Sequence, residues 1–280
     1  MRRPQSNKEK SNTPGKRKEY TKKPFSKGRV ATSSKKTNPA SSDPDLIRLN
    51  RYVANAGVCS RREADTYITA GNVTVNGKTI TEMGHKVKLT DIVKFDGRLL
   101  NPQKKEYVLL NKPKNFITTT SDERGRRTVM ELVSKASKSR LVPVGRLDKN
   151  TTGLLLFTND GDLAKKLTHP RHGIRKIYHV ELNKNLSGED LKKIQEGITL
   201  DDGPIKVDEV SYINNSPKRE VGIEIHSGRN RIVRRIFEHL GYEVKKLDRV
   251  IFAGLTKKDL PRGHWRHLTK QEVINLGMNQ

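Results

Sequence analysis

Apolar residues recur with helical spacing at the start of the chain's apolar part. This spacing predicts a first helix over residues 46–56, and Gly57 follows it as a residue favoured just beyond a helix end. Ser60 can cap a second helix, because Glu63 stands three residues later and completes a capping box. We therefore expect two short helices separated by a glycine, ahead of the first strands.

Continuous and alternating apolar runs further along the chain predict a series of strands. The clearest runs cover residues 107–110 and 154–157 and are typical of core strands. Further strands are predicted at residues 73–75, 87–95, 174–182, 207–213, 220–226 and 247–255, and helices at residues 129–133, 163–167 and 232–240 and from Ser187 onward. This pattern predicts an α+β fold, with a mixed, mainly antiparallel β-sheet flanked by helices.

Composition divides the chain at about residue 45. Residues 1–45 contain 13 Lys and Arg against four Asp and Glu, and they are almost free of apolar side chains. Such a segment cannot bury enough surface to offset its ordering entropy, so we expect a disordered basic arm. The polar stretch at residues 101–105 predicts a further boundary, between a small domain at residues 46–105 and a larger one at residues 106–276.

The net charge of +26 identifies the class of partner. The arm supplies nine of these charges, so the rest of the chain still carries +17. A cationic excess of this size attracts polyanions, with nucleic acid as the first candidate and an anionic membrane surface as the second.

Other sequence features restrict location and chemistry. The chain has no run of about twenty apolar residues and no apolar secretion signal, so we expect a cytoplasmic protein that spans no membrane. Cys59 is the single cysteine, which excludes an intrachain disulfide and a cysteine-cluster zinc site. His169 and His172 have no acidic or cysteine ligand at matching spacing, so a metal site is not expected there.

The first basic motif lies in the small predicted domain. It comprises Arg48-Leu-x-Arg51-Tyr, Gly57-x-Cys-Ser60-Arg-Arg-Glu-Ala64 and Gly71-x-Val-x-Val75-Asn-Gly77. These residues resemble the S-four-like RNA-binding domain of ribosomal proteins, tyrosyl-tRNA synthetases and several RNA modifiers. The resemblance implies RNA-backbone contacts from the basic side chains Arg48, Arg51, Arg61, Arg62 and Lys78. The alternative is a charged surface that only contacts solvent.

Candidate chemistry appears in two later stretches. Arg146 and Asp148 stand two residues apart just before a core strand, a placement that suits a polar group with a chemical function. The alternative is a solvated surface pair. The second stretch has Arg229, Arg231, Arg234 and Arg235 at the start of a helix, where phosphate binding is the natural use. A Lys and a Tyr, Lys176 and Tyr178, also share an otherwise apolar strand face.

Several kinds of enzyme are excluded by the missing motifs. The sequence has no phosphate-binding loop of nucleotide hydrolases, no dinucleotide fingerprint, no Ser-His-Asp arrangement and no zinc-deaminase signature. Chemistry must therefore rely on Asp148, an Arg partner and an aromatic such as Tyr178. A carboxylate nucleophile with an aromatic platform for a flipped base forms a coherent set.

Five motifs together resemble a known enzyme family. They are Gly145-Arg146-Leu147-Asp148 with Thr152-Gly153-Leu154-Leu155, Asn111-Lys112-Pro113, Lys176-x-Tyr178, Gly228-Arg229-Asn230-Arg231-x-Val-Arg234-Arg235, and Leu260-Pro-Arg-Gly-x-Trp265. Their types and order are similar to those of the RsuA/RluB family of ribosomal RNA pseudouridine synthases. The resemblance covers about residues 46–276 and implies isomerisation of uridine to pseudouridine without cofactor or metal.

The resemblance also implies roles for individual residues. Asp148 would be the nucleophile, attacking C1′ of the sugar or C6 of the base. Arg234 would form a buried ion pair with Asp148, with Arg229 as the alternative. Tyr178 would stack on the flipped uracil and assist removal of the C5 proton. Arg146 would fill the gap in the RNA stack or bind a phosphate, and Lys176, Arg229, Arg231 and Arg235 would contact RNA.

The C-terminal motifs bear on the substrate. The Leu260–Trp265 ending is more similar to enzymes of large-subunit (23S) rRNA, whereas residues 238–247 resemble a sister large-subunit enzyme. We expect a monomer that acts on ribosomal RNA or on a pre-ribosomal particle. Two alternatives stay open: a non-catalytic RNA-binding assembly factor, and the same chemistry on small-subunit rRNA or tRNA.

The basic arm gives a first prediction. Deleting residues 1–45 should weaken RNA binding and flatten the dependence of log Kd on log salt, because fewer counterions are released. Titrations of full-length and shortened protein with the same RNA at several salt concentrations measure both effects. An unchanged slope would show that the arm does not contact RNA.

Overall fold

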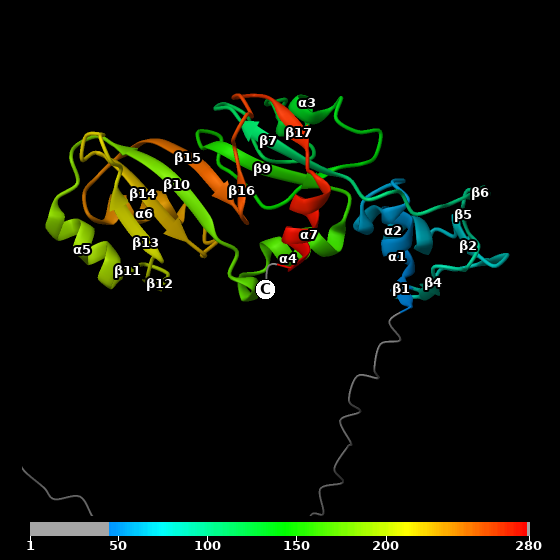
Figure 1. Cartoon of the computed structure of the whole chain (residues 1–280). Helices are drawn as coiled ribbons and strands as arrows, with labels where there is room; N and C mark the ends of the chain where they lie inside the picture. The colour runs from blue at the N-terminus through cyan, green and yellow to red at the C-terminus, as the bar shows by residue number, and fades with distance from the viewer. Residues whose placement is uncertain (1–44, 279–280) are drawn as a thin grey trace, which may run out of the picture. The chain divides into compact units, whose positions relative to one another are not determined.

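The computed structural model describes residues 45–278 of the chain (Figure 1). The predicted arm at residues 1–45 therefore lies outside the described residues, apart from Asp45. No helix in residues 45–278 is both long enough and apolar enough to span a bilayer.

The first elements form a small α+β unit. They are β1 (Leu46–Arg48), α1 (Leu49–Asn55), α2 (Arg61–Thr69), β2 (Val73–Val75), β3 (Lys78–Thr79), β4 (Lys86–Lys88), β5 (Val93–Phe95) and β6 (Arg98–Leu99). The strand order β3-β2-β5-β6 makes one sheet, and β1 pairs separately with β4. A core that includes Leu49, Val53, Ile68 and Val93 joins both helices to the strands.

Local predictions for this unit are largely confirmed. Ser60 caps α2 in a capping box: its hydroxyl accepts from the Glu63 amide at 3.2 Å, and its own amide donates to the Glu63 carboxylate at 2.6 Å. The prediction of a helix from residue 46 is wrong, because residues 46–48 pair with β4 before the helix begins. The strand pair predicted over residues 87–95 is present as β4 and β5, but these two strands pair with different partners and not with each other.

A larger mixed sheet follows. The elements are β7 (Tyr107–Lys112), α3 (Val129–Val133), β8 (Val142–Pro143), β9 (Thr152–Thr158), α4 (Gly161–Thr168), a 3₁₀ turn (Pro170–His172), β10 (Lys176–Leu182), α5 (Gly188–Glu196), β11 (Ile198–Leu200), β12 (Gly203–Ile205), β13 (Glu209–Tyr212), β14 (Glu220–Ile225), α6 (Ile232–His239), β15 (Val244–Phe252), β16 (Leu255–Thr256), β17 (Trp265–His267) and α7 (Lys270–Met278). The strand order is β13-β14-β10-β15-β9-β7-β17, with β8 and β16 added beside β9 and β15. The β15–β9 pair is parallel and the other described pairs are antiparallel, which confirms the predicted sheet type.

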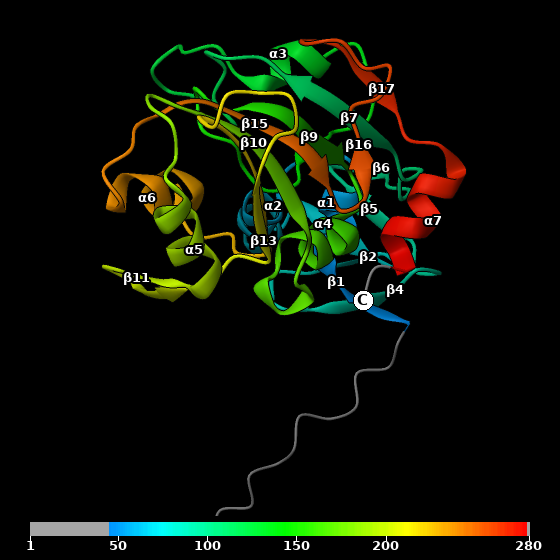
Figure 2. The same cartoon turned by 60° about the vertical axis from the view of Figure 1, so that its left-hand side comes forward.

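The central strands β7 and β9 are buried on both faces, which explains their continuous apolar sequence. Leu155 and Phe157 pack into one core together with residues of α3, α5 and α6. Leu154 and Leu156 pack into the core on the other face, with residues of α4 and α7. Figure 2 shows α5 and α6 well separated from α4 and α7. Alternate side chains of β9 thus hold two layers of helices in place. The sequence did not predict α7, because Leu276 is its one buried residue.

Gly153 at the start of β9 allows the parallel strand β15 to approach closely. Its φ is +104°, and a Cβ at this position would lie 2.3 Å from the carbonyl oxygen and 2.5 Å from the amide nitrogen of Arg249. The backbone of β15 cannot retreat, because it pairs with β10 on its other side. A glycine is therefore required where β9 begins, five residues after Asp148.

Substitution of this glycine should test the close approach. Gly153→Ala should lower the free energy of unfolding by about 1–3 kcal/mol more than Gly254→Ala does, because overpacking forces backbone shifts. Gly254 is the matched control, since it also has positive φ (+81°) but has no atom within 4 Å of an added Cβ. Urea unfolding of both variants measures the difference, and equal losses would show that the β9–β15 contact can relax.

Candidate active site

The loop before β9 holds Asp148 by anchoring the residue beside it. Leu147 is buried, and the Thr118 hydroxyl donates to its carbonyl at 2.8 Å and accepts from its amide at 3.2 Å. Arg146 is exposed and Asp148 is half-buried. The anchored Leu147 therefore fixes the backbone between the two polar residues that the sequence singled out.

A buried lysine holds the turn that follows Asp148. The Lys112 side chain is 0 % exposed, and its ammonium donates to the carbonyls of Asp148 (3.1 Å), Lys149 (3.3 Å) and Thr151 (2.8 Å). It also donates to the Pro113 carbonyl at 3.0 Å. Charged donors make strong hydrogen bonds, so one ammonium fixes three of the four residues in the 148–151 turn.

The Asp148 carboxylate itself has no hydrogen bond or ion pair with any of residues 45–278. Two cations, Lys112 and Arg234, nevertheless lie within electrostatic reach of Asp148. Burial lowers the pKa of each, and the negative charge of Asp148 raises it by a smaller amount, so both pKa values are lowered overall. A carboxylate on a rigid turn, free to contact a ligand and close to two buried cations, is suited to nucleophilic chemistry.

Arg234 on α6 is buried as predicted, but its contacts differ from the prediction. It is 9 % exposed, its Nη1 donates to the Val244 carbonyl at 2.8 Å, and its Nε has no partner among the described residues. The predicted direct ion pair with Asp148 is therefore wrong for this structure, because the Val244 carbonyl engages the guanidinium. The unpaired, buried Nε leaves Arg234 with a donor to offer.

Tyr178 lies in the apolar core that connects these elements. It is 9 % exposed and belongs to the same cluster as Leu147 and as Ile232 and Val233 of α6. Tyr178 therefore shares one apolar core with a neighbour of Asp148 and with two neighbours of Arg234. The grouping of Asp148, Arg234 and Tyr178 in one site stays a prediction.

Lys176 shares the strand face of Tyr178 and is bound to the backbone. Its ammonium donates to the carbonyls of Ile174 (2.9 Å) and His226 (2.7 Å), and burial lowers its pKa to about 8, assisted by Arg249. Two of the three donors of the amine are thus engaged by the backbone, and an RNA contact from Lys176 stays a prediction.

The other arginines near α6 are bound to carboxylates. Arg235 makes two hydrogen bonds to Asp202 (2.9 and 2.7 Å), and Arg229 makes one (3.0 Å) and also binds the carbonyls of Gly203 and Pro204. Arg231 has φ of +49° and pairs with Glu238 at 3.1 Å. The sequence predicted free phosphate ligands here. The structure instead uses Arg229 and Arg235 to hold the turn between β11 and β12, so Arg229 is not a partner of Asp148.

The basic residues of the small unit are more accessible. Arg48, Arg61, Arg62 and Lys78 are exposed. Arg61 contacts Asn50 at 3.4 Å, and Arg51 forms an ion pair with Asp162. Four of the five predicted RNA contacts are thus available at the surface.

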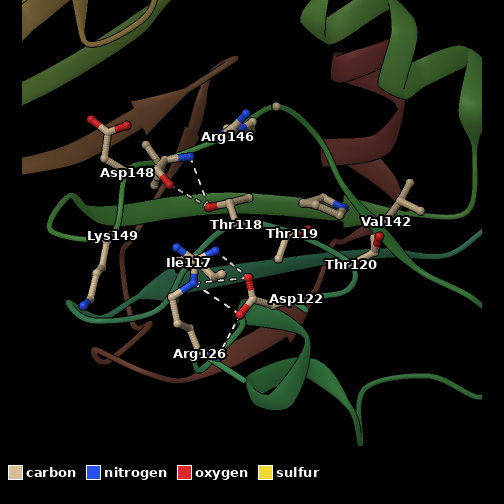
Figure 3. Close-up of a pocket in the computed structure, with 13 residues that line it drawn as sticks. Ile117, Thr118, Thr119, Thr120, Asp122, Arg126, Val142, Arg146, Asp148 and Lys149 are labelled. Carbon is tan, nitrogen blue, oxygen red and sulfur yellow. Dashed lines mark hydrogen bonds and ion pairs between the residues drawn. The ribbon is translucent and has the colours of Figure 1, made fainter. Parts of the chain in front are cut away.

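A cavity of about 730 Å³ opens beside Asp148 (Figure 3). Its lining residues come from two segments, Ile117–Thr120 with Asp122 and Arg126, and Val142–Pro143 with Gly145–Lys149. Residues 45–278 contain no cluster of three or more His, Cys, Asp or Glu side chains that could hold a metal ion. His169 instead accepts a hydrogen bond from the Arg171 amide in the 3₁₀ turn.

Sequence reasoning missed two groups that position the site. Lys112 was noted only as part of a motif; its place at the end of an apolar strand, next to Pro113, was the available signal. Asp202 lies in an Asp-Asp-Gly-Pro turn that did not draw attention. Its partners are distant in sequence, so pattern alone could not identify it.

Comparison with known proteins finds two family models that match this chain. A model described as RNA pseudouridylate synthase matches residues 106–239, and an S4 domain model matches residues 47–93.

Similar proteins occur in several bacteria. The ribosomal large subunit pseudouridine synthase B of Bacillus subtilis (strain 168) is 40% identical, with 82% of this chain and 96% of that protein covered. The dual-specificity RNA pseudouridine synthase RluF of Escherichia coli (strain K12) is 38% identical, with 82% and 78% covered. A crystal structure of a pseudouridylate synthase matches with a TM-score of 0.58 and 29% identity, covering 82% of this chain and 99% of that one.

The buried lysine yields a prediction about pH. Burial lowers the pKa of Lys112 to about 8 from its ordinary 10.5, against a smaller upward effect of Asp148. Between these values the unfolded chain binds more protons than the folded one, so stability rises with pH. The unfolding free energy of the wild type should therefore rise relative to that of Lys112→Met from about pH 8 to about pH 10. Lys176 contributes the same pH dependence to the wild type and to Lys112→Met, so its contribution cancels in the difference between them. Parallel pH profiles in urea unfolding would contradict the assignment.

Proposed function

Because the chain belongs to the RNA pseudouridylate synthase family and carries an S4 domain, we propose that it isomerises a uridine of large-subunit ribosomal RNA. The Asp148 carboxylate carries this proposal: it stands on a rigid turn, without a protein partner among residues 45–278, beside a cavity. The B. subtilis relative, named for the large ribosomal subunit, supports the choice of RNA. Residues 46–105 would bind RNA and residues 106–276 would perform the reaction.

Asp148 would act as the nucleophile of the reaction. Attack of its carboxylate at C1′ of the sugar would break the glycosidic bond to N1, and attack at C6 would instead form an adduct on the base. In either route the N1–C1′ bond breaks, the base turns, C5 bonds to C1′ and the Asp148 oxygen leaves the carbon that it attacked. The C5 proton is then lost while N1 gains one. The product has the same atoms as the substrate. The hydrogen bonds from Lys112 to the 148–151 turn support this role, because a nucleophile must be held within a narrow range of positions.

Arg234 and Tyr178 would assist Asp148. Arg234 supplies a buried positive charge within electrostatic reach of the nucleophile and keeps an unused Nε donor. Tyr178 is anchored in the apolar core by its neighbours, so its ring can serve as a rigid platform for the uracil. Its hydroxyl makes no hydrogen bond within residues 45–278, which leaves it available for the C5 proton.

RNA binding would involve both parts of the chain. Arg146 has no partner within the described residues and is exposed next to the nucleophile, so it can enter the space left by the flipped base or bind a phosphate. Arg48, Arg61, Arg62 and Lys78 would contact the RNA backbone. Such an enzyme would work in the cytoplasm as a monomer, on ribosomal RNA or on an assembling particle.

Replacing the nucleophile tests the mechanism. Asp148→Asn should reduce pseudouridine formation by at least about a thousandfold and leave RNA affinity within a few fold, because the amide keeps the shape but not the nucleophile. The measurement is single-turnover conversion of an rRNA fragment, together with its Kd. Asp259→Asn is the control, since this exposed residue has a positive φ that Asn tolerates. Full activity of Asp148→Asn would exclude the mechanism.

A second experiment identifies the RNA. Pseudouridine maps of the large-subunit, small-subunit and transfer RNAs should be compared in cells with and without the gene. The proposal expects the loss of a large-subunit position, restored by wild-type protein but not by Asp148→Asn. Loss confined to small-subunit or transfer RNA would reject the substrate while keeping the chemistry.

A further inference from the structure

The cavity beside Asp148 extends beyond the space that the target base needs. Its volume of about 730 Å³ is within the range of pockets that enclose drug-sized ligands, about 300–1,000 Å³. Asp148 and Lys149 lie at one end and Thr120 and Val142 at the other, and the Asp148 carboxylate points away from Asp122 and Arg126 (Figure 3). Tyr178, the proposed platform for the uracil, is not among the lining residues. The cavity thus leads from the nucleophile to a separate region.

The walls of this region combine apolar surface, a hydroxyl and free positive charge. Ile117, Val142 and Pro143 supply half-buried apolar surface. Within residues 45–278 the side chains of Thr120, Arg146 and Lys149 make no hydrogen bond or ion pair. A nucleobase suits an apolar wall with a hydroxyl, and a phosphate suits an arginine with a lysine. The lining residues therefore offer groups for both parts of a nucleotide.

The acidic residue in the wall does not oppose an anion. The Arg126 guanidinium binds Asp122 at 2.5 Å from Nη2 and at 3.2 Å from Nε, and the Arg126 amide donates to the same carboxylate at 2.8 Å. These hydrogen bonds lower the pKa of Asp122 to about 2, so the pair stays ionised and internally neutral. The same bonds close the 122–126 loop, which gives the pocket a preformed wall.

We propose that this pocket binds the nucleotide adjacent to the target uridine. Its base would lie at the Thr120–Val142 end, and the phosphate that joins it to the uridine would lie near Arg146 and Lys149. This inference rests on the proposed function, because an RNA with a uridine flipped onto Asp148 supplies such a neighbour. The pocket would help to select the modified position, since it accepts the base beside the uridine as well as the uridine itself.

The test combines altered RNA with a filled pocket. The probe is an rRNA hairpin that contains the mapped uridine, used intact or with an abasic nucleotide directly before or directly after it. Wild-type protein should bind one of the abasic hairpins about tenfold more weakly than the intact hairpin, because one base contact is lost. It should bind the other abasic hairpin almost as well as the intact one.

Thr120→Trp should bind the intact hairpin about tenfold more weakly than the wild type does. Removal of the base to which the wild type is sensitive should not weaken binding to this variant any further. Thr256→Trp, at the exposed position of β16, should behave as wild type.

A second variant tests the phosphate end and does not depend on a bulky side chain. Lys149→Gln should weaken binding to all three hairpins alike and lower the slope of log Kd against log salt by about one. An unchanged slope would overturn the phosphate position.

The outcomes separate this inference from the proposed function. If wild type forms no pseudouridine in the intact hairpin, the proposed function fails, and the inference fails with it. If pseudouridine forms but both abasic hairpins bind as the intact one does, the neighbour pocket is overturned while the function stands. If Thr120→Trp still binds the intact hairpin more tightly than the abasic one, the neighbour pocket is also overturned. The pocket is filled in this variant, so it could not cause the difference in affinity.

Discussion

The interaction between the Lys112 ammonium and the 148–151 turn is the constraint on which the site depends. The fully buried Lys112 ammonium donates hydrogen bonds to carbonyl oxygens, and three of these carbonyls belong to the turn that carries Asp148. Burying such a charge is costly, so it persists only where its donors are well satisfied. The strand β7 supplies this lysine from its last position, and the adjacent strand β9 begins directly after the turn. The sheet therefore positions the carboxylate through one polar side chain.

Positive charge in this protein is used in three distinct ways. Arg229, Arg235 and Arg126 are bound to carboxylates and shape loops, whereas Arg146 and Lys149 have no such partner within residues 45–278. Lys112 and Arg234 are buried and Lys176 is half-buried, and backbone carbonyls hold all three. Arg146 and Lys149 are thus two free cations beside Asp148, where an RNA backbone need displace only solvent. The large net charge attracts RNA at long range, and this smaller set acts at the site.

The sequence predicted the sheet type and most elements, and it singled out Asp148, which the structure places on an anchored turn beside a cavity. Helical and strand periodicity succeeded where side chains face a single core, as in α6, and continuous apolar runs identified β7 and β9. Periodicity failed at Leu46–Arg48, where strand pairing overrode the local helical preference. It also failed in α7, where few side chains are buried. It also could not assign the partners of Arg234, Arg229 and Lys176. Those partners are backbone carbonyls and a carboxylate brought near by the fold, and no spacing rule encodes them.

The most direct test of the account is a crystal structure of Asp148→Asn bound to an RNA hairpin that contains the target uridine. In this complex the uridine should be flipped and stacked on Tyr178, with C1′ or C6 about 3–3.5 Å from the side-chain oxygen at position 148. Lys112 should still contact the carbonyls of the turn. A uridine that remains stacked in the RNA, or one that lies against another carboxylate such as Asp202, would contradict the assignment of Asp148 as the nucleophile.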